Sequence, residues 1–193
     1  MRNLRSRMRC AIAVGLLLLV PISTLAAERP PNLVLIMTDN HGPWTLGCYG
    51  NSDIRTPHVD ALAARGVLFE NAFANNAVCS PTRASVLTGL MPSGHGVHRF
   101  LNGPTQIGPD AYNTLEEFDT LPSLLVANGF VAGLCGKWHL GGEMQPHEGF
   151  SYWITKPTGS SAGFYDQRVI EGGRIRNEPR SLTDLWTEHG VKF

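Results

Sequence analysis

The sequence lacks an excess of charge of either sign. Its 193 residues carry 16 Lys and Arg against 16 Asp and Glu, so the formal net charge is zero. Proteins that bind nucleic acid usually present a basic face, and a neutral balance gives no support to that function. Internal repeats and low-complexity tracts are also missing, while 42% of the residues are apolar. This length and composition predict one globular domain, or part of a larger one.

The sequence also lacks an apolar run long enough to cross a bilayer comfortably. The run CAIAVGLLLLVPI follows four arginines in MRNLRSRMR and precedes the small residues STLAA. A basic start, a short apolar run and small residues at a cleavage point are typical of a secretory signal peptide. We therefore expect residues 1–27 to be removed and 28–193 to be exported to the periplasm or extracellular space, without a stable membrane anchor. The alternative is that the segment stays uncleaved as an anchor.

Cysteine is scarce, with only Cys48, Cys79 and Cys135 beyond the signal peptide. An odd number leaves at least one thiol unpaired in an exported protein. A Cys48–Cys135 disulfide is one alternative, and burial of each as a small apolar residue is the other. Cys79 differs because SPTRASVLTG follows it, and an early Pro with a final Gly predicts a helix over 80–89 with Ser80 as N-cap. A cysteine beside a helix N-terminus feels the positive end of the helix dipole, which makes its thiol more acidic and more reactive.

Strand-like and helix-like segments alternate along the chain. Continuous apolar runs are typical of strands buried in a parallel sheet, and segments with an early Pro and a final Gly are typical of helices. Their alternation predicts an α/β fold with a mostly parallel central sheet flanked by helices. The predicted strands are 32–39, 67–74 and 130–136, and the predicted helices, besides 80–89, are 56–66, 120–129 and 182–189.

Polar residues follow each predicted strand. Ligands of parallel α/β sheets bind at the carboxyl ends of the strands, so we expect these side chains to share one edge. Hard oxygen ligands suit Ca²⁺ or Mg²⁺, and cationic groups suit a tetrahedral oxyanion such as sulfate or phosphate. In chain order the candidates are Asp39 and Asn40, then Cys79 and Arg83, then Lys137 and His139.

Three motifs carry a resemblance to a known family. The segment Cys79-Ser80-Pro81-Thr82-Arg83, followed by ASVLTG, resembles the Cys-x-Pro-x-Arg signature of the type I sulfatases, in the alkaline phosphatase superfamily. GKWHLG at 136–141 resembles the second sulfatase signature, and LIMTDNHG resembles the opening metal-binding strand. The resemblance covers about residues 31–141 in the order and spacing of the family.

The resemblance implies a role for each candidate. A formylglycine-generating enzyme would convert Cys79 to Cα-formylglycine, whose hydrate attacks sulfur, releases the alcohol and then expels sulfate as the aldehyde re-forms. Arg83 would steady the formylglycine, and Lys137 and His139 would bind the sulfate oxygens. The metal, Ca²⁺ with Mg²⁺ as alternative, would be held by Asp39, Asn40 and the modified Cys79.

One position departs from the family pattern. The usual pair is Asp-Asp, whereas this sequence has Asn40 after Asp39. An amide oxygen still ligates Ca²⁺, but the site loses one negative charge. Structural explanations also stay open: Lys137 as a surface lysine, His139 as a packed histidine, and His95 in SGHGVH as a loop-packing residue.

The resemblance predicts a sulfuric ester hydrolase, with sulfated carbohydrate among the candidate substrates. The alternatives are a phosphate or phosphonate ester hydrolase of the same superfamily, and an inactive fragment. The family implies a catalytic domain more than twice this long, with further metal ligands, a histidine and a lysine from later in the chain. We therefore interpret 28–193 as the N-terminal part of a sulfatase catalytic domain, alkaline phosphatase-like and incomplete at its C-terminus, and expect this chain alone to be inactive.

Overall fold

The computed structural model describes residues 30–193. The chain divides into two units, Met1–Thr38 and Asp39–Phe193, and the second contains all the helices and strands given below. In the first unit, residues 30–38 are exposed and belong to no strand. The strand predicted over 32–39 is therefore wrong in this structure, because no described strand pairs with its backbone groups. The predicted signal peptide, 1–27, lies outside the described residues.

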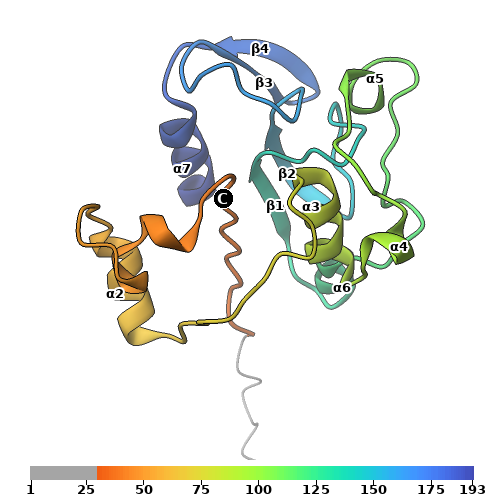
Figure 1. The fold of residues 1–193 in the computed structure, drawn as a ribbon. Coiled ribbons are helices and arrows are strands. Elements are labelled where there is room, and N and C mark those ends of the chain that lie inside the picture. The colour runs from red at the N-terminus through yellow and green to blue at the C-terminus, as the bar shows by residue number, and fades with distance from the viewer. Residues whose placement is uncertain (1–29) are drawn as a thin grey trace, which may run out of the picture. The chain divides into compact units, whose positions relative to one another are not determined.

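The sheet of the second unit has four strands in the order β1 (Ala132–Gly136), β2 (Phe150–Thr155), β3 (Gln167–Glu171) and β4 (Arg174–Glu178) (Figure 1). The strand predicted over 130–136 is confirmed as β1. Only the β1–β2 pairing is parallel, whereas β2–β3 and β3–β4 are antiparallel. The prediction of a mostly parallel sheet is therefore corrected to a mixed sheet.

All four predicted helices are confirmed: α2 (Pro57–Arg65), α3 (Cys79–Thr88), α6 (Leu121–Ala127) and α7 (Leu182–Lys192). In α6 the side chain of Thr120 accepts a hydrogen bond from the backbone of Ser123, and the side chain of Ser123 accepts one from Thr120. Such a reciprocal capping box satisfies backbone N–H groups that the first turn leaves free. Shorter elements are the 3₁₀ turns η1 (Pro43–Thr45) and η2 (Gly47–Tyr49) and the helices α4 (Pro92–His95) and α5 (Gly103–Gln106).

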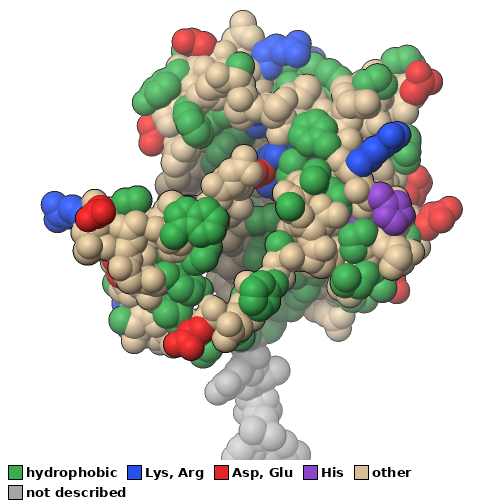
Figure 2. Space-filling model, in the orientation of Figure 1, with side chains coloured by type: hydrophobic (Ala, Val, Ile, Leu, Met, Phe, Trp, Pro, Cys, Tyr) green, Lys and Arg blue, Asp and Glu red, His purple; other side chains and the backbone are tan. Residues whose placement is uncertain are grey.

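The segment 67–74 forms no strand, contrary to the prediction. Its apolar side chains Val67, Phe69 and Phe73 are all exposed, so they gain nothing from packing on a sheet. Figure 2 shows that hydrophobic side chains lie widely over the face drawn, between the charged ones.

Both faces of the parallel pair β1–β2 are covered. Consecutive residues in a strand point to opposite faces, and here Trp153 belongs to a core with Ala84 of α3, whereas Ile154 belongs to a second core with Leu185 of α7. Figure 1 shows α3 and α7 on opposite sides of these strands. The carboxyl ends of β1 and β2 thus emerge from a layered α/β/α arrangement, which is where such folds place ligands.

No helix within residues 30–193 is long and apolar enough to span a bilayer.

Candidate functional site

Cys79 is the first residue of α3. The N-cap is Val78, not Ser80 as predicted, because Ser80 lies inside the helix with its hydroxyl turned to the interior. The helix ends as expected at Gly89, whose φ of 71° lies in the left-handed region that glycine adopts readily. Cys79 is half-buried, and it is a free thiol, as are Cys48 and Cys135. The disulfide considered between the latter two is not formed.

Arg83, one turn after Cys79, joins α3 to the end of β1. Its Nη1 donates to the carbonyl oxygen of Lys137 at 2.6 Å, and its Nη2 lies 3.1 Å from Oδ2 of Asp39. The ammonium of Lys137 lies 2.7 Å from the same Oδ2. Three of the predicted site residues therefore meet at one carboxylate, although each comes from a different segment of the chain.

The charges in this cluster determine the ionisation of Asp39. Partial burial alone would raise the pKa of Asp39, but the hydrogen bonds and charges of Lys137 and Arg83 outweigh it and hold the pKa below its usual value. One carboxylate balances two cations, so the cluster carries excess positive charge. In addition, Nε of Arg83 is buried without a hydrogen-bond partner in the described structure. An unsatisfied cationic donor beside excess positive charge fits an oxyanion ligand.

His139 is only 1% exposed, and its ring lies next to Ser80 in the first turn of α3. Its Nε2 lies 2.9 Å from the carbonyl oxygen of Leu101, and since a carbonyl only accepts, Nε2 carries the proton. The hydroxyl of Ser80 lies 3.3 Å from each ring nitrogen. Burial lowers the pKa of His139 to about 4, further assisted by the positive charges of Lys137 and Arg83, so the ring is neutral at pH 7.

The backbone at His139 is unusual. Its φ of 59° lies in the left-handed region, which non-glycine residues rarely adopt and which is often found at functional sites. Gly159 packs so closely on the ring that a Cβ at this position would collide with it. The structure therefore places His139 in the interior next to the site, and its predicted role as a sulfate ligand stays a prediction.

The predicted metal ligands do not form a complete cation site. Asn40 is exposed with a φ of 53°, and Oδ2 of Asp39 is engaged by two cations. Within residues 30–193 no group of three or more His, Cys, Asp or Glu residues is arranged to hold a metal ion. Ca²⁺ takes six to eight oxygen ligands, so the described residues can supply only part of its shell.

Trp138 and Glu143 are two buried residues of the loop that follows β1. Trp138 is 2% exposed and donates from Nε1 to the carbonyl oxygen of Gly141 at 2.9 Å, so it packs in the interior. Glu143 is fully buried, and neither of its carboxyl oxygens has a hydrogen-bond partner in the described structure. Burial raises the pKa of Glu143 to about 8, and the nearby backbone N–H groups of Glu143, Gly141 and His139 offset only part of this rise.

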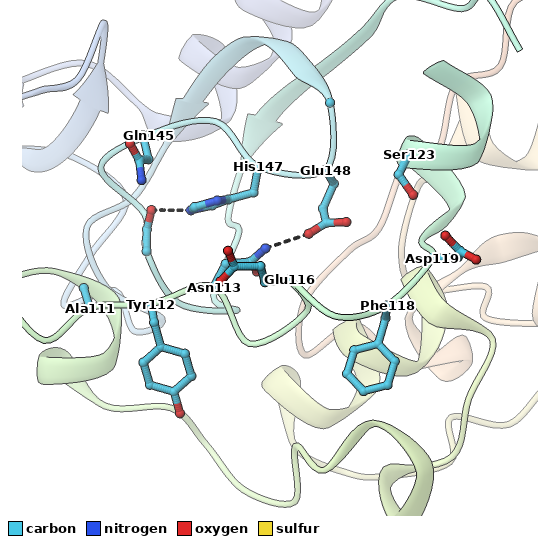
Figure 3. Close-up of a pocket in the computed structure, with 12 residues that line it drawn as sticks. Ala111, Tyr112, Asn113, Glu116, Phe118, Asp119, Ser123, Gln145, His147 and Glu148 are labelled. Carbon is cyan, nitrogen blue, oxygen red and sulfur yellow. Dashed lines mark hydrogen bonds between the residues drawn. The ribbon is translucent and has the colours of Figure 1, made fainter. Parts of the chain in front are cut away.

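A separate cavity of about 550 Å³ lies between α6 and the loops 111–119 and 142–149 (Figure 3). Glu148 lies at its wall, where its carboxylate accepts from Asn113 Nδ2 at 2.6 Å and from Thr120 Oγ1 at 2.7 Å. His147 donates from Nε2 to the carbonyl oxygen of Gly142 at 2.7 Å. The predicted site residues do not line this cavity, so it is distinct from the cluster around Asp39.

Comparison with known proteins places these features in a family. The sequence model of the sulfatase family matches residues 31–192. The chain belongs to the sulfatase family. This confirms the resemblance that the three sequence motifs carry. The chain is 38% identical to human arylsulfatase A over 152 residues, which cover 76% of this chain and 29% of that protein.

Two further relatives extend the comparison. The chain is 32% identical to an N-acetylglucosamine-6-O-sulfatase of Bacteroides thetaiotaomicron, over 86% of this chain and 27% of that protein. A solved structure of a protein in complex with its substrate D-glucosamine-2-N,6-O-disulfate matches with a TM-score of 0.69 and 30% identity, over 86% of this chain and 31% of that one. This sulfatase chain thus spans less than a third of the length of these relatives.

Sequence reasoning missed one charged residue of the region, Lys156. It directly follows β2, and its ammonium lies near Lys137 and Asp39 closely enough to interact with their charges. The position could be found from the sequence only if β2 and its register against β1 were known. Neither was predicted, because the sequence after residue 140 is rich in glycine and proline.

Proposed function

We propose that the domain to which this chain belongs is a sulfuric ester hydrolase with a formylglycine nucleophile derived from Cys79 and a divalent metal ion. The observation that carries the proposal is the convergence of Arg83, one turn into the helix that starts with Cys79, and Lys137, at the end of β1, on the carboxylate of Asp39. Membership of the sulfatase family supports the same chemistry.

Each site residue of this chain would have its own role in the hydrolysis. Formylglycine, when formed, supplies a hydrated aldehyde as nucleophile, so that sulfate is released without attack of water on sulfur. Arg83 holds positive charge one helical turn away, and Lys137 offers an ammonium to the sulfate oxygens as negative charge moves onto them. The neutral ring of His139 could reach a sulfate only by giving up its contact with Leu101 or Ser80.

The metal would be Ca²⁺, with Mg²⁺ as the alternative, and this chain would contribute Asp39, Asn40 and the modified Cys79 to its shell. The remaining ligands would come from outside the described residues, since these contain no further acidic cluster suited to a metal. The residue Asn40 makes the shell less negative than an Asp-Asp pair would, which lowers the affinity for a divalent cation.

We further propose a sulfated carbohydrate as substrate class and export as the route to it. The supporting relatives are an N-acetylglucosamine-6-O-sulfatase and a protein solved with D-glucosamine-2-N,6-O-disulfate. The predicted signal peptide over 1–27 supports a periplasmic or extracellular location, where such sugars are accessible. The formylglycine-generating enzyme is the partner required during maturation.

Hydrolysis of an aryl sulfate against an aryl phosphate by an intact sulfatase with these motifs tests the proposal. We expect preference for the sulfate, and we expect Lys137→Ala to cost roughly 2–4 kcal/mol of transition-state stabilisation, as for the loss of one charge-stabilising donor. Preference for the phosphate would favour the phosphate or phosphonate ester hydrolase instead. Wild-type turnover in Lys137→Ala would show that this residue does not touch the sulfate.

A further inference from the structure

Lysine is rare in this chain, and its distribution is uneven. The sequence contains only three lysines, Lys137, Lys156 and Lys192. Lys137 follows Gly136 and Lys156 follows Thr155, and these two preceding residues are the last paired positions of the parallel strands β1 and β2. Neighbouring strands lie about 4.8 Å apart. Two of the three lysines therefore emerge side by side at the carboxyl ends of adjacent parallel strands, where α/β folds bind ligands.

Lys156 is buried without an acidic partner. It is 6% exposed, and no carboxylate within the described residues lies within salt-bridge distance of its ammonium. Its Nζ donates to the carbonyl oxygen of Ser160 at 2.6 Å and to the hydroxyl of Ser161. An ammonium has three donors, so one N–H is left over. Buried lysines are rare unless they are paired, and this one lacks the partner that would compensate its charge.

The surroundings of Lys156 add to the excess of positive charge. Arg83 and Lys137 share the single carboxylate of Asp39. With Lys156 the region holds three cations and one carboxylate, a surplus of two positive charges. Burial and the charge of Lys137 lower the pKa of Lys156 to about 8, and Asp39 opposes this only in part. Ser160 and Ser161, which accept its hydrogen bonds, are both exposed, so the ammonium lies directly beneath the surface.

We propose that Lys156 is a second lysine of the anion site and binds the same sulfate ion as Lys137. This inference rests on the proposed function. A sulfate dianion would accept a hydrogen bond from the unused N–H of Lys156. Its two negative charges would match the surplus of two positive charges and offset the repulsion between the ammonium groups of Lys137 and Lys156. Lys137 and Asp39 are the charged groups near Lys156, so sulfate changes its surroundings from net repulsive to net attractive and raises its pKa.

A purely structural role makes a different prediction. Lys156 would then serve only to hold the loop 156–161 through Ser160 and Ser161, and sulfate would leave its titration unchanged. The two roles are separated by titrating the lysines directly. The 193-residue chain is labelled with ¹³Cε-lysine, which gives three signals, and these are assigned with Lys137→Arg and Lys192→Arg. The pH is varied from 6 to 11 with sodium sulfate or with sodium chloride at equal ionic strength.

We expect sulfate to raise the pKa of Lys156 by about one pH unit, which is a tenfold preference of the ion for the charged form. Lys192, exposed at the end of α7, is the internal control and should not respond. In Lys137→Gln the response of Lys156 should disappear, because one ion bridges both lysines. In Lys156→Gln the affinity for sulfate, read from the Lys137 signal, should fall about tenfold, and Lys156→Arg should restore most of it.

Four results would overturn the inference, and they differ in what they imply for the proposed function. A response of Lys137 without one of Lys156 refutes the second lysine but leaves the proposed function intact. A response of Lys156 that survives in Lys137→Gln shows a separate anion and refutes the shared site. The absence of any response in both lysines refutes the shared site and also removes support for sulfate binding by this chain. An equal response in chloride shows an effect of ionic strength only, which likewise refutes it.

Discussion

Arg83 donates from Nη1 to the carbonyl oxygen of Lys137 at 2.6 Å, so the helix that begins with Cys79 is tied to the loop that follows β1. The second arm of the same guanidinium contacts Asp39 at 3.1 Å. A side chain that spans a carbonyl and a carboxylate fixes the relative positions of three segments. The distance between the proposed nucleophile and the proposed sulfate-binding lysine therefore depends on Arg83.

Arg83→Lys should lower the free energy of unfolding by about 1–3 kcal/mol. One ammonium cannot replace both arms of the guanidinium, so a half-buried carbonyl or carboxylate loses its partner. Urea unfolding of the 193-residue chain measures the difference. Arg168→Lys at an exposed position of β3 is the matched control and should change stability by less than about 0.5 kcal/mol. Equal losses in the two variants would refute the structural role given to Arg83.

His139 should make stability depend on pH in mildly acidic solution. Burial lowers its pKa from 6.5 to about 4 in the folded state. Between these values the unfolded chain binds the proton and the folded chain does not, so stability falls as the pH is lowered. The loss should approach about 3 kcal/mol at pH 4. In His139→Gln, the difference in the free energy of unfolding from wild type should shrink by this amount between pH 7 and pH 4. A difference that stays constant over this range would contradict a neutral, buried His139 ring.

Glu143 should have the opposite effect at higher pH. Burial raises its pKa from 4.5 to about 8, so the folded chain holds a proton that the unfolded chain releases. Stability should therefore fall as the pH rises from 4.5 to 8, by about 4 kcal/mol in total. Glu143→Gln keeps the shape of the side chain but removes the ionisable carboxyl group. The free energy of unfolding of this variant should therefore increase relative to that of wild type across this range. If the free energies of unfolding of the two proteins depend equally on pH between pH 5 and pH 8, a neutral buried Glu143 is contradicted.

Gly159→Ala should destabilise the chain by about 1–3 kcal/mol, because its Cβ would collide with the His139 ring and overpack the interior. Thermal unfolding measures the loss. Gly103→Ala is the matched control, since a Cβ at Gly103 meets no atom within 4 Å. If both variants unfold at the wild-type temperature, Gly159 does not pack on the ring as described.

The helices were predictable because short-range signals define their ends. Pro57 and Pro122 stand in the first turn of α2 and α6, and Gly89 follows α3 in a left-handed conformation. These preferences arise from steric restrictions and capping within a few residues, so the sequence alone contains them. Strand β1 was also predictable, as a short run of apolar and small residues that ends before Lys137.

The other strands depend on partners that a local reading cannot supply. The apolar run at 32–39 resembles a buried strand, yet residues 30–38 pair with no described strand and are exposed. Strands β3 and β4 are joined by Gly172 and Gly173, both with positive φ, which is a recognisable two-residue hairpin turn. Their charged residues and the glycine-rich surroundings obscured it.

The same distinction applies to the site. The rule that ligands bind at the carboxyl ends of parallel strands predicted that Arg83, Lys137 and Asp39 would share one edge, and the structure brings these three together. Lys156 carries no motif, and its place beside Lys137 follows only from the register of Gly136 against Thr155. The interior position of His139 also could not be predicted, because it depends on contacts with Ser80 and Leu101 from distant parts of the chain.

The most direct test of the account is the mass of the peptide that contains Cys79. The chain is produced together with a formylglycine-generating enzyme and digested with trypsin. The mass of the peptide that spans residues 66–83 is then measured by mass spectrometry. Conversion of the CH₂SH group to CHO lowers the mass by about 18 Da, and we expect this loss at Cys79 but not at Cys48 or Cys135, which lie outside the motif. If Cys79 remains entirely a thiol under conditions that convert a known sulfatase, the proposed nucleophile is wrong.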